Sequence, residues 1–319
     1  TKMRLFRWQQ ILLILVTFYA GQVFAAGKID DLLEQADKVR SSDRVSFNRV
    51  MSELATHKSQ MSSEQFNVLQ LLEGYKAGIE GNYKSAETLL NQLINSDALL
   101  EVRFRAAFTL ANIQSLSRNF VPAFTNLNLA LSWIDKIEKP ELRVQVLISA
   151  AYTYSESGLF DESQSYILQA RQNTLTDRDS CLLGLLYRQN MHSRNETYEG
   201  EQVSEIEQAC TSANERLALA FMTALDAQLL ESKQQHAAAY TLLQDGLAAA
   251  EQSKYPRLIA DYYLGLARTS YALKEVTSAT LYLDKIHAMS QSLGFSMPLV
   301  RSYELQTQIA EESNDISRA

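Results

Sequence analysis

Glycine and proline are scarce in this sequence, with 11 and 4 residues among 319. Few turns can therefore rely on special backbone angles, which favours long helices over a many-stranded sheet. The 4 histidines (His57, His192, His236 and His287) lie far apart along the chain, so no cluster predicts a metal site. The sequence also has no phosphate-binding loop, dinucleotide glycine motif or G-x-S-x-G. Neither a catalytic site nor a cofactor is therefore predicted for these residues.

Positive charge is also in short supply, because 30 basic residues face 37 acidic ones and the net charge is −7. An acidic protein surface repels the phosphate backbone of DNA and RNA. Nucleic acid is therefore not expected among the partners of this chain.

The first 25 residues are predicted to be a signal peptide. Three basic residues precede an apolar run at 11–19, and Val23 and Ala25 lie three and one residues before a predicted cleavage ahead of Ala26. An uncleaved membrane anchor is the alternative, although a membrane-spanning helix needs about 20 apolar residues. The sequence therefore predicts export, and a short signal of this kind suits a bacterial envelope.

Six segments share one pattern, which is a turn, a residue expected to fill the gap between two helices, two variable residues and a small residue. The gap-filling residue is apolar in all but one segment. They are EGNYKSA (80–86), SRNFVPA (117–123), SGLFDES (157–163), KQQHAAA (233–239), LKEVTSA (273–279) and SNDISRA (313–319). The small residues lie 37, 40, 76, 40 and 40 positions apart, and the gap of 76 holds two periods with an irregular unit near 180–213. Amphipathic stretches flank each motif, so the pattern predicts an all-α superhelical array of antiparallel helix pairs.

Further small residues and prolines mark the first helix of each pair. Gly74, Ala111, Ala151, Ala227 and Ala267 each lie 12 positions before a small residue of the motif. Small side chains at both places let two helices approach closely. Prolines at 140, 256 and 298 follow the motifs and fit the first turn of the next unit, where a proline loses no hydrogen bond.

This arrangement resembles the tetratricopeptide repeat (TPR), which has small residues at helix contacts and a glycine–aromatic turn like Gly81–Tyr83 and Gly158–Phe160. The resemblance covers residues 63–319 and implies a TPR-like α-solenoid. Residues 26–62 are predicted to form an N-terminal helical segment without a clear motif. Ala319 matches the small position of a seventh unit, so the last repeat is expected to be truncated and to continue downstream.

Two stretches show a narrower similarity. KYPRLIADYYLGLARTSYALKE (254–275) and SMPLVRSYELQTQIAEESNDISRA (296–319) resemble the exported repeats of bacterial membrane-bound GGDEF diguanylate cyclases. The resemblance implies a sensory module on the periplasmic face of the inner membrane of a Gram-negative bacterium, ahead of a downstream transmembrane helix and a cyclase domain. That enzyme would join two GTP molecules into cyclic di-GMP with Mg²⁺, as a homodimer. No GGDEF string occurs in these 319 residues, so no catalytic residue can be assigned.

The alternative function is a free periplasmic TPR scaffold that binds envelope proteins. In both cases the expected partner is a protein, a peptide or another ligand of the cell envelope.

The two cysteines are predicted to form a disulfide. Cys181 opens the first helix of the irregular unit, Cys210 ends its second, and the polar loop 193–200 lies midway between them. In an antiparallel hairpin this symmetry places them side by side, and an exported protein meets oxidising conditions. Two free buried thiols are the alternative.

Four tyrosines are candidates for a binding groove. Tyr152, Tyr154, Tyr262 and Tyr263 lie on predicted first helices, which line the concave face of such a superhelix. They would then contact a ligand or a peptide. The alternative is that they pack between neighbouring helices.

Overall fold

The computed structural model describes residues 27–196, 201–294 and 296–312, and this part of the chain is helical without strands. The predicted signal peptide (1–25) and the seventh motif (313–319) lie outside the described residues.

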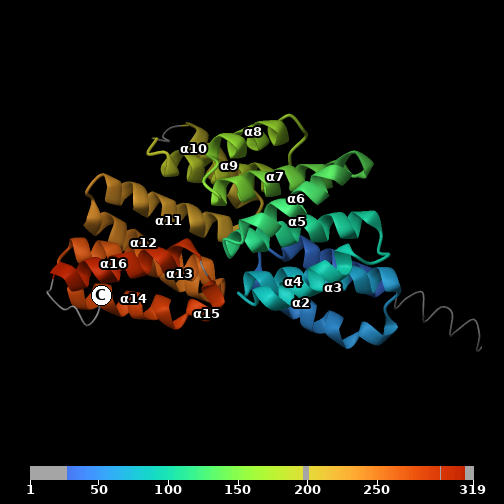
Figure 1. The fold of residues 1–319 in the computed structure, drawn as a ribbon, viewed down its shortest axis with the longest axis horizontal. Helices are drawn as coiled ribbons and strands as arrows, with labels where there is room; N and C mark the ends of the chain where they lie inside the picture. Colours follow the sequence, from blue (N-terminus) through green and yellow to red (C-terminus); the bar gives the residue numbers. More distant parts are fainter. Residues whose placement is uncertain (1–26, 197–200, 295, 313–319) are drawn as a thin grey trace, which may run out of the picture.

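Six first helices have the same length of 17 residues. They are α3 (Ser63–Ile79), α5 (Leu100–Leu116), α7 (Pro140–Glu156), α9 (Asp177–Ser193), α11 (Arg216–Ser232) and α13 (Pro256–Ala272). Each is followed by an antiparallel second helix. These are α4 (Tyr83–Ile94), α6 (Phe120–Trp133), α8 (Phe160–Arg171), α10 (Glu201–Ser212), α12 (His236–Gln252) and α14 (Val276–Ala288). The predicted all-α superhelical array of helix pairs is confirmed (Figure 1).

The repeat motif sets the start of the second helices. Five of them begin at the residue that lies three positions before the small residue. The small residues Ala86, Ala123, Ser163, Ala239 and Ala279 are all fully buried. Because they carry little or no side chain beyond Cβ, the two helices of a pair can pack closely.

Further elements lie at the two ends of the array and between its units. A helix over 27–39 and α2 (Arg44–Thr56) precede the first TPR-like pair, followed by the 3₁₀ turn η1 (Lys58–Gln60). Ile29, Phe47 and Leu69 belong to one buried cluster, so these N-terminal helices pack on α3. The 3₁₀ turn η2 (Ile134–Lys136) follows α6, and α15 (Ser290–Leu293) and α16 (Met297–Glu312) follow α14.

The irregular unit has an arginine at a position where the other units have a small residue. The twelfth residues of the six first helices are Gly74, Ala111, Ala151, Arg188, Ala227 and Ala267. Arg188 is only 1% exposed and forms an ion pair with Asp226 on α11. A long charged side chain therefore fills the place where the other units have a methyl group or a hydrogen.

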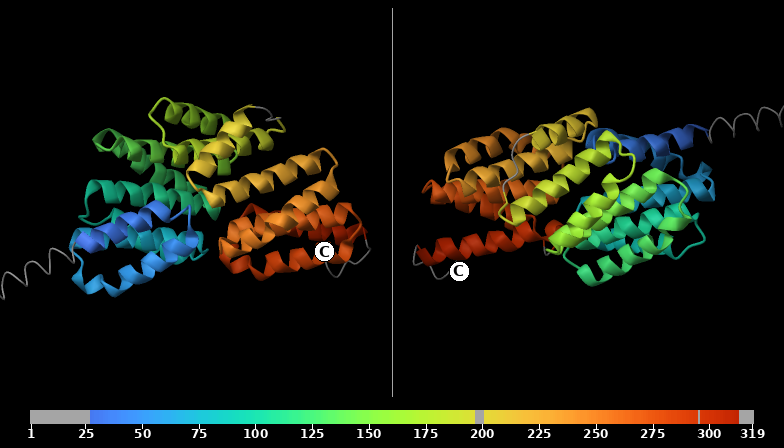
Figure 2. Two further views of the ribbon diagram at one scale, coloured as in Figure 1. Left: turned by 180° about the vertical axis from the view of Figure 1, so that it is seen from behind. Right: turned by 90° about the horizontal axis from the view of Figure 1, so that it is seen from above.

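The superhelix coils far enough for its two ends to meet. In Figure 1 the blue and cyan helices of the first units face the orange and red helices of the last units, and Figure 2 shows the same arrangement from behind and from above. A Cβ atom added to Gly81 would lie 2.2 Å from the carbonyl oxygen of Ser292. Ser41 also donates a hydrogen bond of 3.0 Å to Glu215. The inner face of the coil is therefore partly enclosed.

Among the residues that the structure describes, no helix combines the length and the apolar character needed to cross a bilayer.

Candidate ligand-binding cavity

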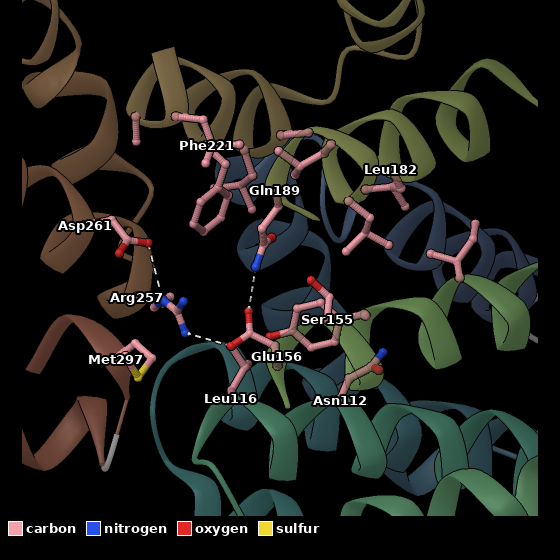
Figure 3. Close-up of a pocket in the computed structure, with 18 of the residues that line it drawn as sticks. Asn112, Leu116, Ser155, Glu156, Leu182, Gln189, Phe221, Arg257, Asp261 and Met297 are labelled. Carbon is pink, nitrogen blue, oxygen red and sulfur yellow. Dashed lines mark hydrogen bonds and ion pairs between the residues drawn. The ribbon is translucent and has the colours of Figure 1, made fainter. Parts of the chain in front are cut away.

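A cavity of about 750 Å³ lies inside the coil (Figure 3). All six first helices from α3 to α13 contribute side chains to it, and α16 adds Met297 and Arg301. Its size is within the range of about 300–1,000 Å³ that is typical of ligand sites.

The equal length of the first helices gives the cavity wall a regular pattern. The thirteenth residue of every one lines the cavity and is polar or aromatic: Tyr75, Asn112, Tyr152, Gln189, Gln228 and Arg268. The ninth residues of the later five also line it and are apolar: Phe108, Ile148, Leu185, Ala224 and Leu264. Positions four apart lie on the same helix face. The wall therefore carries a hydrogen-bonding row beside an apolar row.

One acceptor on this wall lacks a partner. The Oε1 atom of Gln145 is buried and has no hydrogen bond within the described part of the chain, and Gln145 lines the cavity. Its neighbour Ser149 is satisfied, because its hydroxyl donates to Asn112 Oδ1 at 2.6 Å. Buried polar atoms are nearly always paired, so Gln145 is a suitable acceptor for a bound molecule.

A charged cluster lies where α7 and α13 face each other across the cavity (Figure 3). Arg257 is 3.4 Å from Oε2 of Glu156 and 3.3 Å from Oδ2 of Asp261. Gln189 donates to Oε1 of Glu156 at 3.1 Å. Burial opposes the charge of Arg257, but the two carboxylates outweigh it and hold the pKa of the guanidinium above its usual value. Burial raises the pKa of Asp261, and nearby Glu156 adds to this effect against the pull of Arg257.

Other arginines of the wall have contacts of their own or are exposed. Arg178 contacts Glu215 at 2.8 Å, and Arg268 holds Glu231 through two bonds of 2.8 and 2.9 Å. The guanidinium of Arg118 lies over the ring of Phe120. The Arg301 side chain is exposed.

The structure brings one of the four candidate tyrosines to the cavity. Tyr152 lines it, and burial raises the pKa of its hydroxyl well above the usual value. Tyr154, Tyr262 and Tyr263 are not among the lining residues.

The other three tyrosines pack between helices. Tyr154 stacks on Tyr166 with ring centres 5.3 Å apart. Tyr262 is 1% exposed and donates to the carbonyl oxygen of Ala220 at 3.1 Å. Tyr263 stacks on Tyr282 and donates to Glu251.

Cys181 and Cys210 lie side by side, as the hairpin symmetry of their unit predicts. Both are fully buried, and their sulfur atoms are 2.03 Å apart, the separation of a disulfide. This link joins α9, which lines the cavity, to its partner helix α10. Within the described residues, no group of three or more His, Cys, Asp or Glu side chains is arranged to hold a metal ion.

No family model matches the sequence, and a comparison with curated proteins gives no significant match. Among solved structures, the chain is similar to a Rap protein crystallised in complex with competence and sporulation factor. The two superpose with a TM-score of 0.64 at 13% sequence identity, over 91% of this chain and 84% of the other. The fold is therefore a TPR-like helical array, and at this low identity the likeness concerns the fold alone.

Proposed function

We propose that this chain is an exported binding module whose inner cavity holds a short extended segment of a peptide or protein. The observation that carries the proposal is the cavity itself, to which each of the six first helices contributes its thirteenth residue. A repeat array of this kind offers a long continuous surface, and such surfaces serve binding.

The two rows on the wall suit a polypeptide better than a compact metabolite. An extended backbone presents an N–H and a C=O group every ~3.3 Å, and the row of thirteenth residues can pair with such groups at intervals along the coil. Side chains of the ligand would then contact the apolar row. The solved Rap structure contains a second molecule, competence and sporulation factor, which supports the view that this fold can accommodate a partner.

The finer proposal is that the module senses an envelope signal for a membrane-bound diguanylate cyclase. It is supported by the similarity of residues 254–275 and 296–319 to the repeats of such proteins, and by the signal-like first 25 residues. GTP and Mg²⁺ would belong to the separate cyclase domain, and a downstream transmembrane helix and a homodimer would connect it to this module. This hypothesis predicts that a membrane helix and a GGDEF domain follow residue 319, which the coding sequence tests directly. A stop codon shortly after the array would favour the free periplasmic scaffold.

The function of the cavity is tested by cyclic di-GMP output in cells that express the full-length protein. Asn112→Ala and Gln228→Ala remove hydrogen-bonding groups from the wall, and Val121→Ala removes a side chain that is 82% exposed. We expect both cavity variants to change the response to envelope conditions and the Val121→Ala control to respond like the wild type. A cyclase that responds normally in both cavity variants would contradict sensing through the cavity.

A further inference from the structure

We propose that Glu156 and Asp261 form a subsite for one cationic group of the ligand, an ammonium or a guanidinium. The inference rests on the proposed function, since it concerns what the cavity binds. It adds a chemical requirement that the repeat fold does not impose.

The first argument is a count of buried charges. Arg257 is the partner of two carboxylates, and the side chains of Glu156, Asp261 and Arg257 are 6%, 18% and 14% exposed. Arg268 also acts on Asp261, but both of its bonds go to Glu231. That pair is balanced, and the other three groups hold two carboxylates and one guanidinium, so one negative charge lacks a counter-charge of its own. A buried charge without a partner is costly, and a ligand cation would remove that cost.

The second argument is unused bonding capacity. Contacts of 3.3 and 3.4 Å from Arg257 are longer than the 2.7–2.9 Å typical of charge-assisted hydrogen bonds. Arg257 contacts Asp261 through Oδ2, so the second oxygen, Oδ1, is not used in that contact. Each carboxylate oxygen can accept two hydrogen bonds, so a donor from the ligand finds free acceptors. The raised pKa of Asp261 is consistent with this shortage of positive charge.

The third argument is the surrounding wall, which is aromatic. Tyr152, Tyr255 and Phe221 line the same cavity, and Phe221 and Tyr255 meet edge to face at 5.8 Å. Tyr152 and Tyr255 lie close enough to act on the charge of Arg257. Aromatic faces attract organic cations. A bare Ca²⁺ would instead need six to eight oxygen ligands, which two carboxylates do not supply. The subsite therefore fits the end of a lysine or arginine side chain, or the amino terminus of a peptide.

The first test needs no ligand. Asp261→Asn keeps the shape and an acceptor for Arg257 but removes the surplus charge, so we expect thermal unfolding of the full chain about 2 °C above the wild type. Glu231→Gln is the matched control, because it breaks a balanced one-to-one pair and should lower the midpoint. If Asp261→Asn also lowers the midpoint, Asp261 is a structural ion-pair partner and the proposal is wrong.

The second test measures binding with two peptide pools. Both pools are capped pentapeptides with mixed flanking residues. The central residue is lysine in one pool and norleucine in the other. These two side chains differ mainly in the charged amine of lysine. The full-length protein should retain the lysine pool about tenfold more strongly, which is about 1.4 kcal/mol. Asp261→Asn should lose this preference while remaining folded by circular dichroism.

The remaining outcomes separate this inference from the proposed function. Equal binding of both pools would overturn the cation subsite and leave peptide binding intact. No binding of either pool would overturn both.

Discussion

At five turns of the array, the residue at the equivalent position adopts a left-handed backbone conformation. It is glycine in two of them, Gly81 and Gly158, with φ of 82° and 83°. Arg118, Gln234 and Lys274 adopt φ of 58°, 62° and 67° at the equivalent position. A residue with a Cβ costs roughly 1–2 kcal/mol there. Tertiary packing must therefore overcome a local preference at three of the five turns.

Replacing Lys274 with glycine should stabilise the protein. The side chain is exposed, so the main effect is relief of the left-handed strain, and we expect the free energy of unfolding to rise by about 1 kcal/mol. Urea unfolding followed by circular dichroism measures it. Glu275→Gly is the control, because Glu275 has φ of −92° and gains nothing from glycine. A Lys274→Gly protein no more stable than this control would show that the turn is not strained.

The stability difference between Asp261→Asn and the wild type should depend on pH. The pKa of Asp261 is raised in the folded protein, so ionisation opposes folding above that pKa. As the pH falls through the raised pKa, Asp261 becomes neutral in the folded protein. Below the ordinary carboxyl value of about 3.9 it is also neutral in the unfolded protein, so its ionisation no longer lowers the free energy of unfolding. We expect the variant's advantage in unfolding midpoint at pH 7 to shrink as the pH falls and to vanish below about pH 4. An advantage that is constant with pH would assign it to something other than this charge.

The sequence identifies helix contacts better than it identifies the cavity wall. Small residues can be recognised because close packing excludes other types, and the residues that directly follow Gly74, Ala111 and Ala227 are Tyr75, Asn112 and Gln228 on the wall. That offset would have revealed most of the row at the thirteenth position. Arg188 could not be foreseen, because its burial depends on Asp226 of the next unit.

At the scale of helices, the α9–α10 pair differs from the other units. It holds Arg188 at the small position, and it contains the two cysteines. A cross-link between α9 and α10 fixes this pair independently of the packing that the other units share. The positions of α9 residues in the cavity wall, such as Gln189, therefore depend on an unusual unit.

The disulfide can be tested by titrating thiols in the unfolded, unreduced protein. We expect no free cysteine, and two free thiols would contradict the bond. Replacing Cys181 and Cys210 with serine should lower the free energy of unfolding by about 3–4 kcal/mol in the chain-entropy model for a loop of this size. Reduction of the wild type should have a similar effect, whereas it should leave the double variant unchanged.

At the scale of the whole molecule, the cavity depends on how the coil closes. The period near 40 predicts the stack of helix pairs, but not how far the stack turns, because curvature comes from small rotations at each interface. The charged cluster needs this curvature, since Glu156 and Arg257 are far apart in sequence and meet only across the coil. For the same reason, sequence patterns within one helix could not predict the cluster.

Opening the coil at Gly81 tests whether closure shapes the cavity. Gly81→Ala introduces a Cβ 2.2 Å from the carbonyl oxygen of Ser292, whereas the same change at Gly158 meets nothing within 4 Å. Both variants carry similar left-handed strain, so only Gly81→Ala should push the two ends apart. We expect small-angle X-ray scattering to show a larger radius of gyration for Gly81→Ala alone, together with faster amide exchange around Ser292. Gly158→Ala should lose stability by about 1–2 kcal/mol without either change. If the two variants scatter identically, contact between the ends does not hold the coil closed.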